Sequence, residues 1–286
     1  MRERRLIRFL LMVSFTIGLG LGLPALVAGQ PVAAASTHVR MSIPKGYTIK
    51  RLKAAYAGHP SRRFVAASKR GMRLNKFSSN RAVDLPSDNN IILTPNRLTA
   101  TQQAEITNFS LQLINQARRQ LKLRPWVYSK GTQKLAADIA KNYQRHGRGI
   151  ENGGHYIKGI NRACRKHGLR LPSGNYVEDM AGFSNQAGSK TMTMTLLKKD
   201  IYFGLKQMLF GFRGPNDTSG QINQRNNYHE WEHAGDLLNT QNALHDGDYD
   251  YYGFSISRVK SNYSLHYVGV TAHVVNNRHY NRSFRP

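Results

Sequence analysis

The sequence predicts an α+β fold in which helices come first and a pair of β-strands comes late. Between Leu98 and Phe210, apolar residues recur at three- and four-residue spacing, which is typical of helices buried on one face. Residues 252–257 and 267–274 alternate instead between apolar and polar, as strands do, and residues 260–262 between them suit a hairpin turn. Helices that bury one face against such a sheet form a layered α-β-α domain.

The helical stretches have recognisable ends. The first begins at the capping-box pattern Thr99-x-x-Gln102 and ends before Pro125. The later stretches are a helix around 135–143, a helix over 157–167, a helix over 195–210 and a short helix at 237–238. Residues 211–227 are rich in Gly, Pro, Asn, Asp and Ser, so we expect a surface loop there.

Residues 1–35 have the parts of a secretory signal. Arginines precede Phe9, an uncharged run extends from Phe9 to Gly29, and small residues surround Ala35. We expect cleavage after Ala35, a secreted or cell-surface location, and no stable membrane anchor afterwards. The alternative is an uncleaved anchor helix, because the apolar run is about long enough to span a bilayer.

The rest of the chain divides into three parts. Residues 36–97 are basic and lack a clear period, so we expect a weakly structured, extended arm with short helical pieces at most. Residues 98–275 form the folded domain, and residues 276–286 form a basic tail. Cys164 is the one cysteine of the sequence, so an intrachain disulfide cannot form. Its helical surroundings predict a buried side chain rather than a nucleophile.

The formal net charge of +26 predicts attraction to polyanions. For an exported protein, the candidate partners are anionic lipid headgroups, phosphate-rich wall polymers and acidic glycans, whereas nucleic acid is not expected. The alternative is that the charge only keeps the protein soluble. The sequence contains no G-x-S-x-G elbow, P-loop or dinucleotide fingerprint, which excludes the enzyme classes that depend on them.

The segment His229-Glu230-Trp231-Glu232-His233 matches H-E-x-x-H. On one helix, His229 and His233 would share a face and could bind zinc, with Glu230 as the general base for a metal-bound water. A catalytic zinc site needs a third protein ligand. The downstream candidates for that ligand are His245, Asp246, Asp248 and Asp250. If His229 instead precedes the helix, the two histidines lie on different faces and the match is accidental.

Three of the histidines outside this motif are weighed individually. His155 follows two glycines, in a connection where a side chain can line a cleft. His266 and His273 are expected in the last strand pair, where their odd spacing places them on opposite faces. Taken singly, each of these is a structural residue more often than a ligand.

As a series, several short motifs resemble the surface-exclusion domain of Gram-positive bacteria, which is related to the CAP superfamily (cysteine-rich secretory, antigen 5 and pathogenesis-related proteins). The motifs are Leu98-Thr99-x-x-Gln102, residues 113–118, residues 135–140, Gly154-His155, residues 167–169, Ile201-Tyr202 and residues 229–234, together with the upstream segment 44–48. The resemblance covers residues 98–275. It implies a CAP-like α-β-α sandwich with a central antiparallel sheet.

The resemblance also implies a cleft lined by histidines and acids, which holds a divalent metal in some members. His155 matches the first cleft histidine, Glu178 resembles the glutamate of a G-E-N segment, and His233 falls at the second histidine. Glu230 or Glu232 would supply another acid. The sequence departs from the family pattern at Val177, at Asp179 and in residues 230–232, and it lacks the disulfides of the eukaryotic relatives.

Together these observations favour a secreted, cell-surface-associated binding protein of the surface-exclusion type, held to anionic wall polymers by charge. Surface proteins of other cells are further candidate partners. The alternative is a zinc-dependent hydrolase of peptide or wall material, with His155, Glu178 and His233 around the ion. Neither zinc nor another divalent cation is required by the preferred interpretation.

Overall fold

The computed structural model describes residues 39–77, 86–169, 174–185, 189–214, 218–241, 246–276 and 284–285, all within the compact unit Ala34–Pro286. The expected signal segment and most of the expected C-terminal tail lie outside these described residues. Among the described residues, no helix combines the length and apolar character needed to cross a bilayer.

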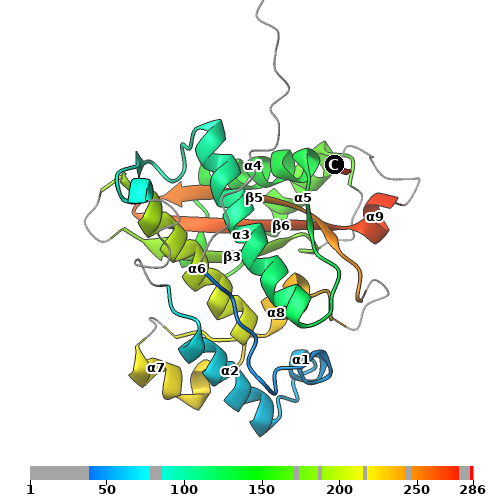
Figure 1. Cartoon of the computed structure of the whole chain (residues 1–286). Coiled ribbons are helices and arrows are strands. Elements are labelled where there is room, and N and C mark those ends of the chain that lie inside the picture. Colours follow the sequence, from blue (N-terminus) through cyan, green and yellow to red (C-terminus); the bar gives the residue numbers. More distant parts are fainter. Residues whose placement is uncertain are drawn as a thin grey trace, which may run out of the picture. The chain divides into compact units, whose positions relative to one another are not determined.

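The helices that the sequence predicts are present, with additional short elements (Figure 1). The helices are α1 (Ile49–Tyr56), α2 (Arg62–Leu74), α3 (Ala100–Gln120), α4 (Lys130–Arg145), α5 (Ile157–Lys166), α6 (Met194–Phe210), α7 (Ser219–Asn223), α8 (Glu232–Leu237) and α9 (Ala272–Asn276). Short 3-10 turns are η1 (Pro86–Asn89), η2 (Ile150–Asn152) and η3 (Arg225–Asn227). The strands are β1 (Ile92–Leu93), β2 (Val127–Tyr128), β3 (Glu178–Ser184), β4 (Met192–Thr193), β5 (Asp250–Val259) and β6 (Asn262–Thr271).

The central sheet has the strand order β2-β5-β6-β3. β5 and β6 form the expected antiparallel hairpin, in which Lys260 takes a left-handed backbone conformation (φ 54°). β3 pairs antiparallel with β6, and the two-residue β2 runs parallel to β5. β3 is therefore an edge strand of this sheet.

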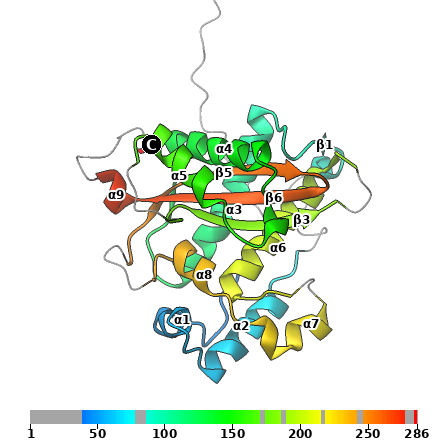
Figure 2. The same ribbon diagram turned by 180° about the vertical axis from the view of Figure 1, so that it is seen from behind.

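Helices cover both faces of the sheet, as the fold-class prediction requires (Figures 1 and 2). On β6, Val268 and Val270 belong to the core beneath α4 and α5, whereas Leu265 and Tyr267 belong to the core shared with α3 and α6. This division follows from the period of two along a strand. Cys164 is buried in the α4–α5 core, as predicted.

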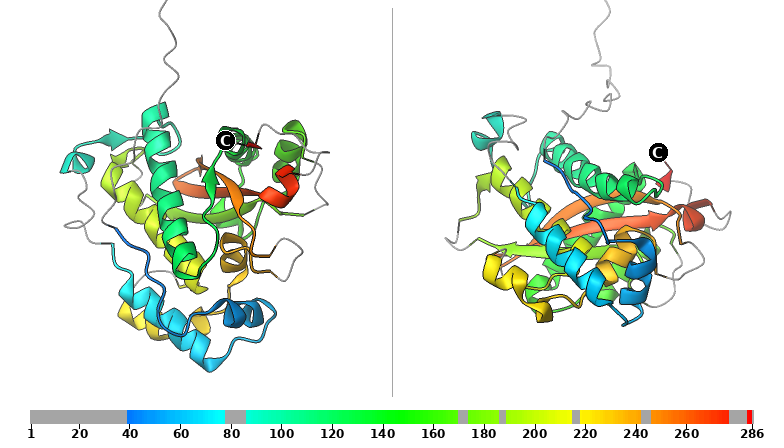
Figure 3. Two further views of the ribbon diagram at one scale, coloured as in Figure 1. Left: turned by 45° about the vertical axis from the view of Figure 1, so that its right-hand side comes forward. Right: turned by 60° about the horizontal axis from the view of Figure 1, so that its bottom comes forward.

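The basic N-terminal segment is more ordered than its composition predicts. α1 and α2 occupy the stretches where short helical pieces were expected, and they pack onto α8 and α6, respectively (Figure 3). The Phe64 ring lies 5.4 Å from that of Trp231 between centroids. Within residues 39–77 the segment is therefore part of the folded unit and not an extended arm, because its few apolar side chains gather on one helix face.

Two local expectations differ from the structure near the C-terminal half. β6 ends at Thr271, so His273 lies in α9 and not in a strand. The described part of the expected loop 211–227 contains α7 and η3, and it buries Phe212 and Ile222. In the expected tail, Phe284 is also buried.

Candidate functional site

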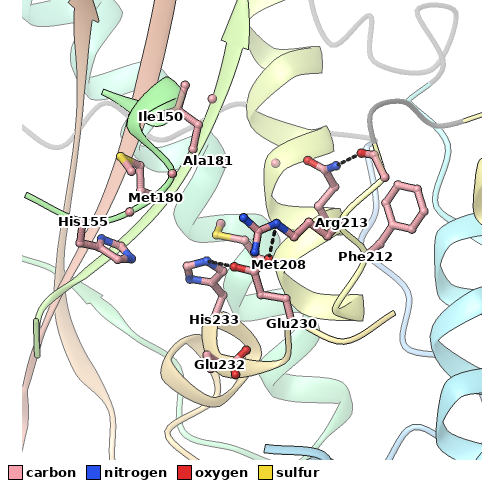
Figure 4. Close-up of a pocket in the computed structure, with 16 residues that line it drawn as sticks. Ile150, His155, Met180, Ala181, Met208, Phe212, Arg213, Glu230, Glu232 and His233 are labelled. Carbon is pink, nitrogen blue, oxygen red and sulfur yellow. Dashed lines mark hydrogen bonds and ion pairs between the residues drawn. The ribbon is translucent and has the colours of Figure 1, made fainter. Parts of the chain in front are cut away.

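A pocket of about 590 Å³ opens beside β3, between η2, α6 and the start of α8 (Figure 4). Its apolar wall comes from Ile150, Met180, Ala181, Met208 and Phe212, and its polar groups are His155, Gln207, Arg213, Glu230, Glu232 and His233. Glycines 153, 154, 182, 204 and 214 complete the lining. An apolar wall with a few convergent polar groups is typical of a ligand-binding site.

Two consecutive acids at the start of β3 orient the two pocket histidines. Neighbouring residues on a strand point to opposite faces, so Glu178 and Asp179 reach different histidines. His155 Nδ1 lies 2.9 Å from Glu178 Oε2, and His233 Nδ1 lies 2.8 Å from Asp179 Oδ1. The two imidazole rings therefore approach the edge of β3 from opposite faces of the sheet, and their centroids are 5.9 Å apart.

The Glu178 side is closed. The hydroxyl of Tyr143 donates a 2.8 Å hydrogen bond to Glu178 Oε2, and His266 Nδ1 lies 2.5 Å from Oε1. Burial by itself raises the pKa of Glu178, but the hydrogen bonds and charges of His155 and His266 outweigh it and lower the pKa to about 2. Glu178 is therefore an ionised, fully buried anchor for His155.

The Asp179 side leads out to the pocket. His233 Nε2 lies 3.4 Å from Glu230 Oε1, and Arg213 Nε lies 3.3 Å from Glu230 Oε2. Burial by itself would lower the pKa of His233. The hydrogen bonds and charges of Asp179 and Glu230 outweigh burial and raise the pKa from 6.5 to about 10. His233 is therefore an imidazolium at neutral pH, within a row of alternating charges from Asp179 to Arg213.

Two more carboxyl groups lie behind this row. Burial and the charge of Asp179 raise the pKa of Asp236 well above its ordinary value. Burial also raises the pKa of Asp250 to about 7, although Asn239 donates a 2.8 Å hydrogen bond to it. The acids behind His233 thus carry less negative charge than their number suggests.

The H-E-x-x-H segment does not lie on one helix. α8 begins at Glu232, so His229 precedes the helix; its side chain is exposed, with Nδ1 2.8 Å from the carbonyl oxygen of Asn226. Glu230 and Glu232 line the pocket with His233, but His229 does not. The geometry that pairs the two histidines of a zinc hydrolase motif is therefore absent from this segment.

The donor groups do not fit the expected zinc site either. Carboxylates behind both Nδ1 atoms, Glu178 for His155 and Asp179 for His233, resemble the support that orients histidine metal ligands. The residues described here contain no group of three or more His, Cys, Asp or Glu side chains placed to hold an ion. Asp246 and Asp248 pair with Lys53 and Arg124, and His245 lies outside the described residues. A three-ligand catalytic zinc centre therefore has no counterpart in this part of the chain.

Of the residues that the sequence singles out, His155, Glu178, His233 and Glu230 come together, while Glu232 lies at the pocket lining and His229 points elsewhere. The contributions of Asp179, His266 and Arg213 were not predicted. His266 is fully buried, and its Nε2 lies 2.8 Å from Ser257 Oγ. Adjacent acids at 178 and 179 inside a strand would have signalled two opposed networks, but residues 178–184 were not recognised as a strand.

Comparison with known proteins finds a structural similarity. The CAP domain of Enterococcal PrgA superimposes with a TM-score of 0.63 and 21% sequence identity, and the match covers 85% of this chain and 90% of that domain's chain. No protein-family model and no curated protein matches the chain. The layered sheet, its helical covers and this similarity together show that the chain has the CAP-like α+β fold that its sequence predicts.

Proposed function

We propose that the chain is an exported, cell-surface binding protein of the surface-exclusion type, which is held to anionic wall polymers by charge and binds a partner in the pocket between His155 and His233. The CAP-like fold and the motif series that resembles the surface-exclusion domain support this class. The expected signal segment supports export. The observation that carries the attachment is the charge of residues 39–77.

No Asp or Glu occurs between Glu3 and Asp84, so every charged side chain of α1 and α2 is cationic. Lys50, Arg62 and Arg63 are exposed. Arg70 donates a hydrogen bond to the carbonyl oxygen of Lys45, and Arg73 donates one to the side-chain oxygen of Asn223. Both acceptors are neutral, so these bonds do not compensate the charges of the two arginines. Because the two helices pack onto the domain, they present these charges on a fixed surface rather than along a loose tether.

The attachment is tested by washing cells that carry the protein with increasing salt. We expect elution as the salt approaches about 1 M, where the Debye length falls to about 3 Å. Retention on the cells at that salt would overturn the attachment by charge.

A matched pair of variants locates the surface. The triple variant Lys50→Glu, Arg62→Glu and Arg63→Glu should elute at markedly lower salt than the wild type. Acidic residues at the start of α2 also favour the helix dipole, so folding is preserved. The control reverses the exposed Lys130, Lys134 and Lys141 of α4, which changes the net charge equally. Equal weakening by both triples would show that net charge alone matters.

The zinc-hydrolase alternative receives no support from the site geometry. His229 lies away from the pocket, and the described residues contain no group of three or more His, Cys, Asp or Glu side chains placed to hold an ion. We therefore propose a binding role for the pocket.

A further inference from the structure

The pocket contains an open stretch of sheet edge. β3 pairs with β6 along one edge only, and its residues Met180, Ala181 and Gly182 line the pocket. Unpaired strand edges bind other strands readily, and proteins usually cover or interrupt them. An edge that forms the wall of a pocket is therefore a candidate binding surface.

The alternation of the antiparallel ladder identifies which backbone groups are open. Gly269 N donates to Val177 O, and Asn185 N donates to Ser261 O, at the two ends of β3. Hydrogen-bonded and non-hydrogen-bonded pairs alternate between these ends. The odd-numbered residues of β3 therefore bond to β6, and the even-numbered residues direct their N–H and C=O groups to the open edge.

The first open position is already covered. The side chain of Asn175 donates to Glu178 O and accepts from Glu178 N, at 2.5 and 3.0 Å. Within the described part of the chain, the N–H and C=O groups of Met180 and Gly182 have no such partner. Met180 is 6% exposed, and backbone groups at so buried a position are nearly always paired in native proteins, with protein, ligand or ordered water.

The surroundings leave room for a partner of strand shape. α6 lies along one face of β3, where Gly204 permits close approach to Ala181, and η2 lies against the other face, with Ile150 over Gly182. At the rim, Cβ atoms placed on Gly153 or Gly154 would meet nothing within 4 Å. The two flanks thus form the walls of a groove whose floor is the edge of β3 (Figure 4).

From this geometry we propose that the pocket binds an extended polypeptide segment, which adds to the edge of β3 and exchanges main-chain hydrogen bonds with Met180 and Gly182. Such strand addition draws affinity from main-chain bonds and specificity from alternate side chains. The guest side chains face Met208 and His233 on one side and Ile150 and His155 on the other. Among the described residues that line the pocket, Phe212 alone carries a phenyl ring, so these residues offer little stacking surface for a glycan. The inference rests on the pocket being the binding site of the proposed function.

The probe is a random library of displayed peptides about eight residues long, enough to pass both open positions at roughly 3.3 Å per residue. A binder selected on the mature chain is then synthesised with a single backbone N-methyl group at each position in turn. We expect alternate N-methyl groups to weaken binding about tenfold, the effect of one lost hydrogen bond, and the intervening ones to have little effect. Sensitivity without this period of two would overturn strand addition.

A variant pair ties the binding to the groove. Gly154→Tyr places a side chain in open space at the groove rim, and Gly220→Tyr does the same in α7, outside the pocket. Both should keep the wild-type thermal midpoint, and only Gly154→Tyr should lower peptide affinity, by about tenfold or more. Equal affinity of both variants for the peptide would place its site elsewhere.

Two other outcomes also decide the matter. If no peptide is selected while N-acetylated wall oligosaccharides bind and Gly154→Tyr blocks them, the pocket is a glycan site and strand addition is overturned. Salt-dependent attachment to cells is measured separately with the same variants. Attachment that persists without peptide binding would overturn this inference alone, and peptide binding without attachment would overturn only the proposed attachment by charge.

Discussion

The two faces of β3 hold similar groups in different settings. On one face, Glu178 is enclosed by Tyr143, His155 and His266, and its side chain has no exposed surface. On the other face, Asp179 holds His233, which is 16% exposed and leads to Glu230, which is 30% exposed. The closed network fixes the position of a ring, whereas the open network brings charge to the pocket. A single strand thus supplies an anchor and a contact surface from adjacent residues.

The largest effect should follow from Glu178→Gln, which removes the charge that two histidines share inside the protein. Breaking a buried charged network typically lowers the free energy of unfolding by about 3 kcal/mol or more. Urea unfolding at neutral pH measures this loss. The control is Lys166→Met, which breaks only the pair between the largely exposed Lys166 and Asp138, leaves His167 bound to Asp138, and should cost about 1 kcal/mol or less. Similar losses in the two variants would contradict the comparison.

The stability of the wild type should decrease in acid through the same residue. The folded-state pKa of Glu178, about 2, is below its ordinary value of 4.5. Its contribution is therefore fully present above about pH 4.5 and is lost as the pH falls toward 2, by an amount of about 3 kcal/mol. Unfolding free energies measured across this pH window should fall more steeply for the wild type than for Glu178→Gln. Parallel curves would show that Glu178 is not the titrating group.

A smaller, local effect should appear on the open face. Asp179→Asn removes one of the two carboxylates that keep His233 charged, so the pKa of His233 should fall from about 10 toward the ordinary 6.5. In the wild type, the stability contributed by the charged ring is fully present below pH 6.5 and is lost as the pH rises through 10. NMR titration of the imidazole resonances measures both pKa values. An unchanged pKa would mean that Glu230 alone holds the proton.

The smallest effect should follow from removing divalent cations. Because the described donor groups do not assemble a three-ligand site, a chelator should leave the thermal midpoint within about 1 °C of its starting value. An ion that binds the native state stabilises it, so its removal would lower the midpoint if an ion were part of the fold. A clear decrease of the midpoint in the wild type but not in His233→Ala would show that His233 ligates an ion. The open face of β3 would then be a metal site, unlike the closed face.

Much of the fold could be predicted because the signals are local. The capping box at Thr99, the helical period through α3 and α6, and the alternation around the β5–β6 turn all act within a few residues. The basic segment was harder to interpret, because charge density indicates weak structure while its stability depends on distant rings such as Trp231. The edge strand 178–184 also lacks a clear alternation of apolar and polar residues, because its first four residues, the two acids included, are all buried.

The sequence by itself determined the layered α+β class, its principal helices and hairpin, the strongly cationic character and a short set of candidate residues. Only the tertiary structure decided which of these residues meet: Glu178 with His155 and His266, Asp179 with His233, and His229 with neither network. The physical reason is that helical and strand periods depend on neighbours in the chain, whereas the protonation of His233 and the open edge at Met180 depend on groups that only folding brings together.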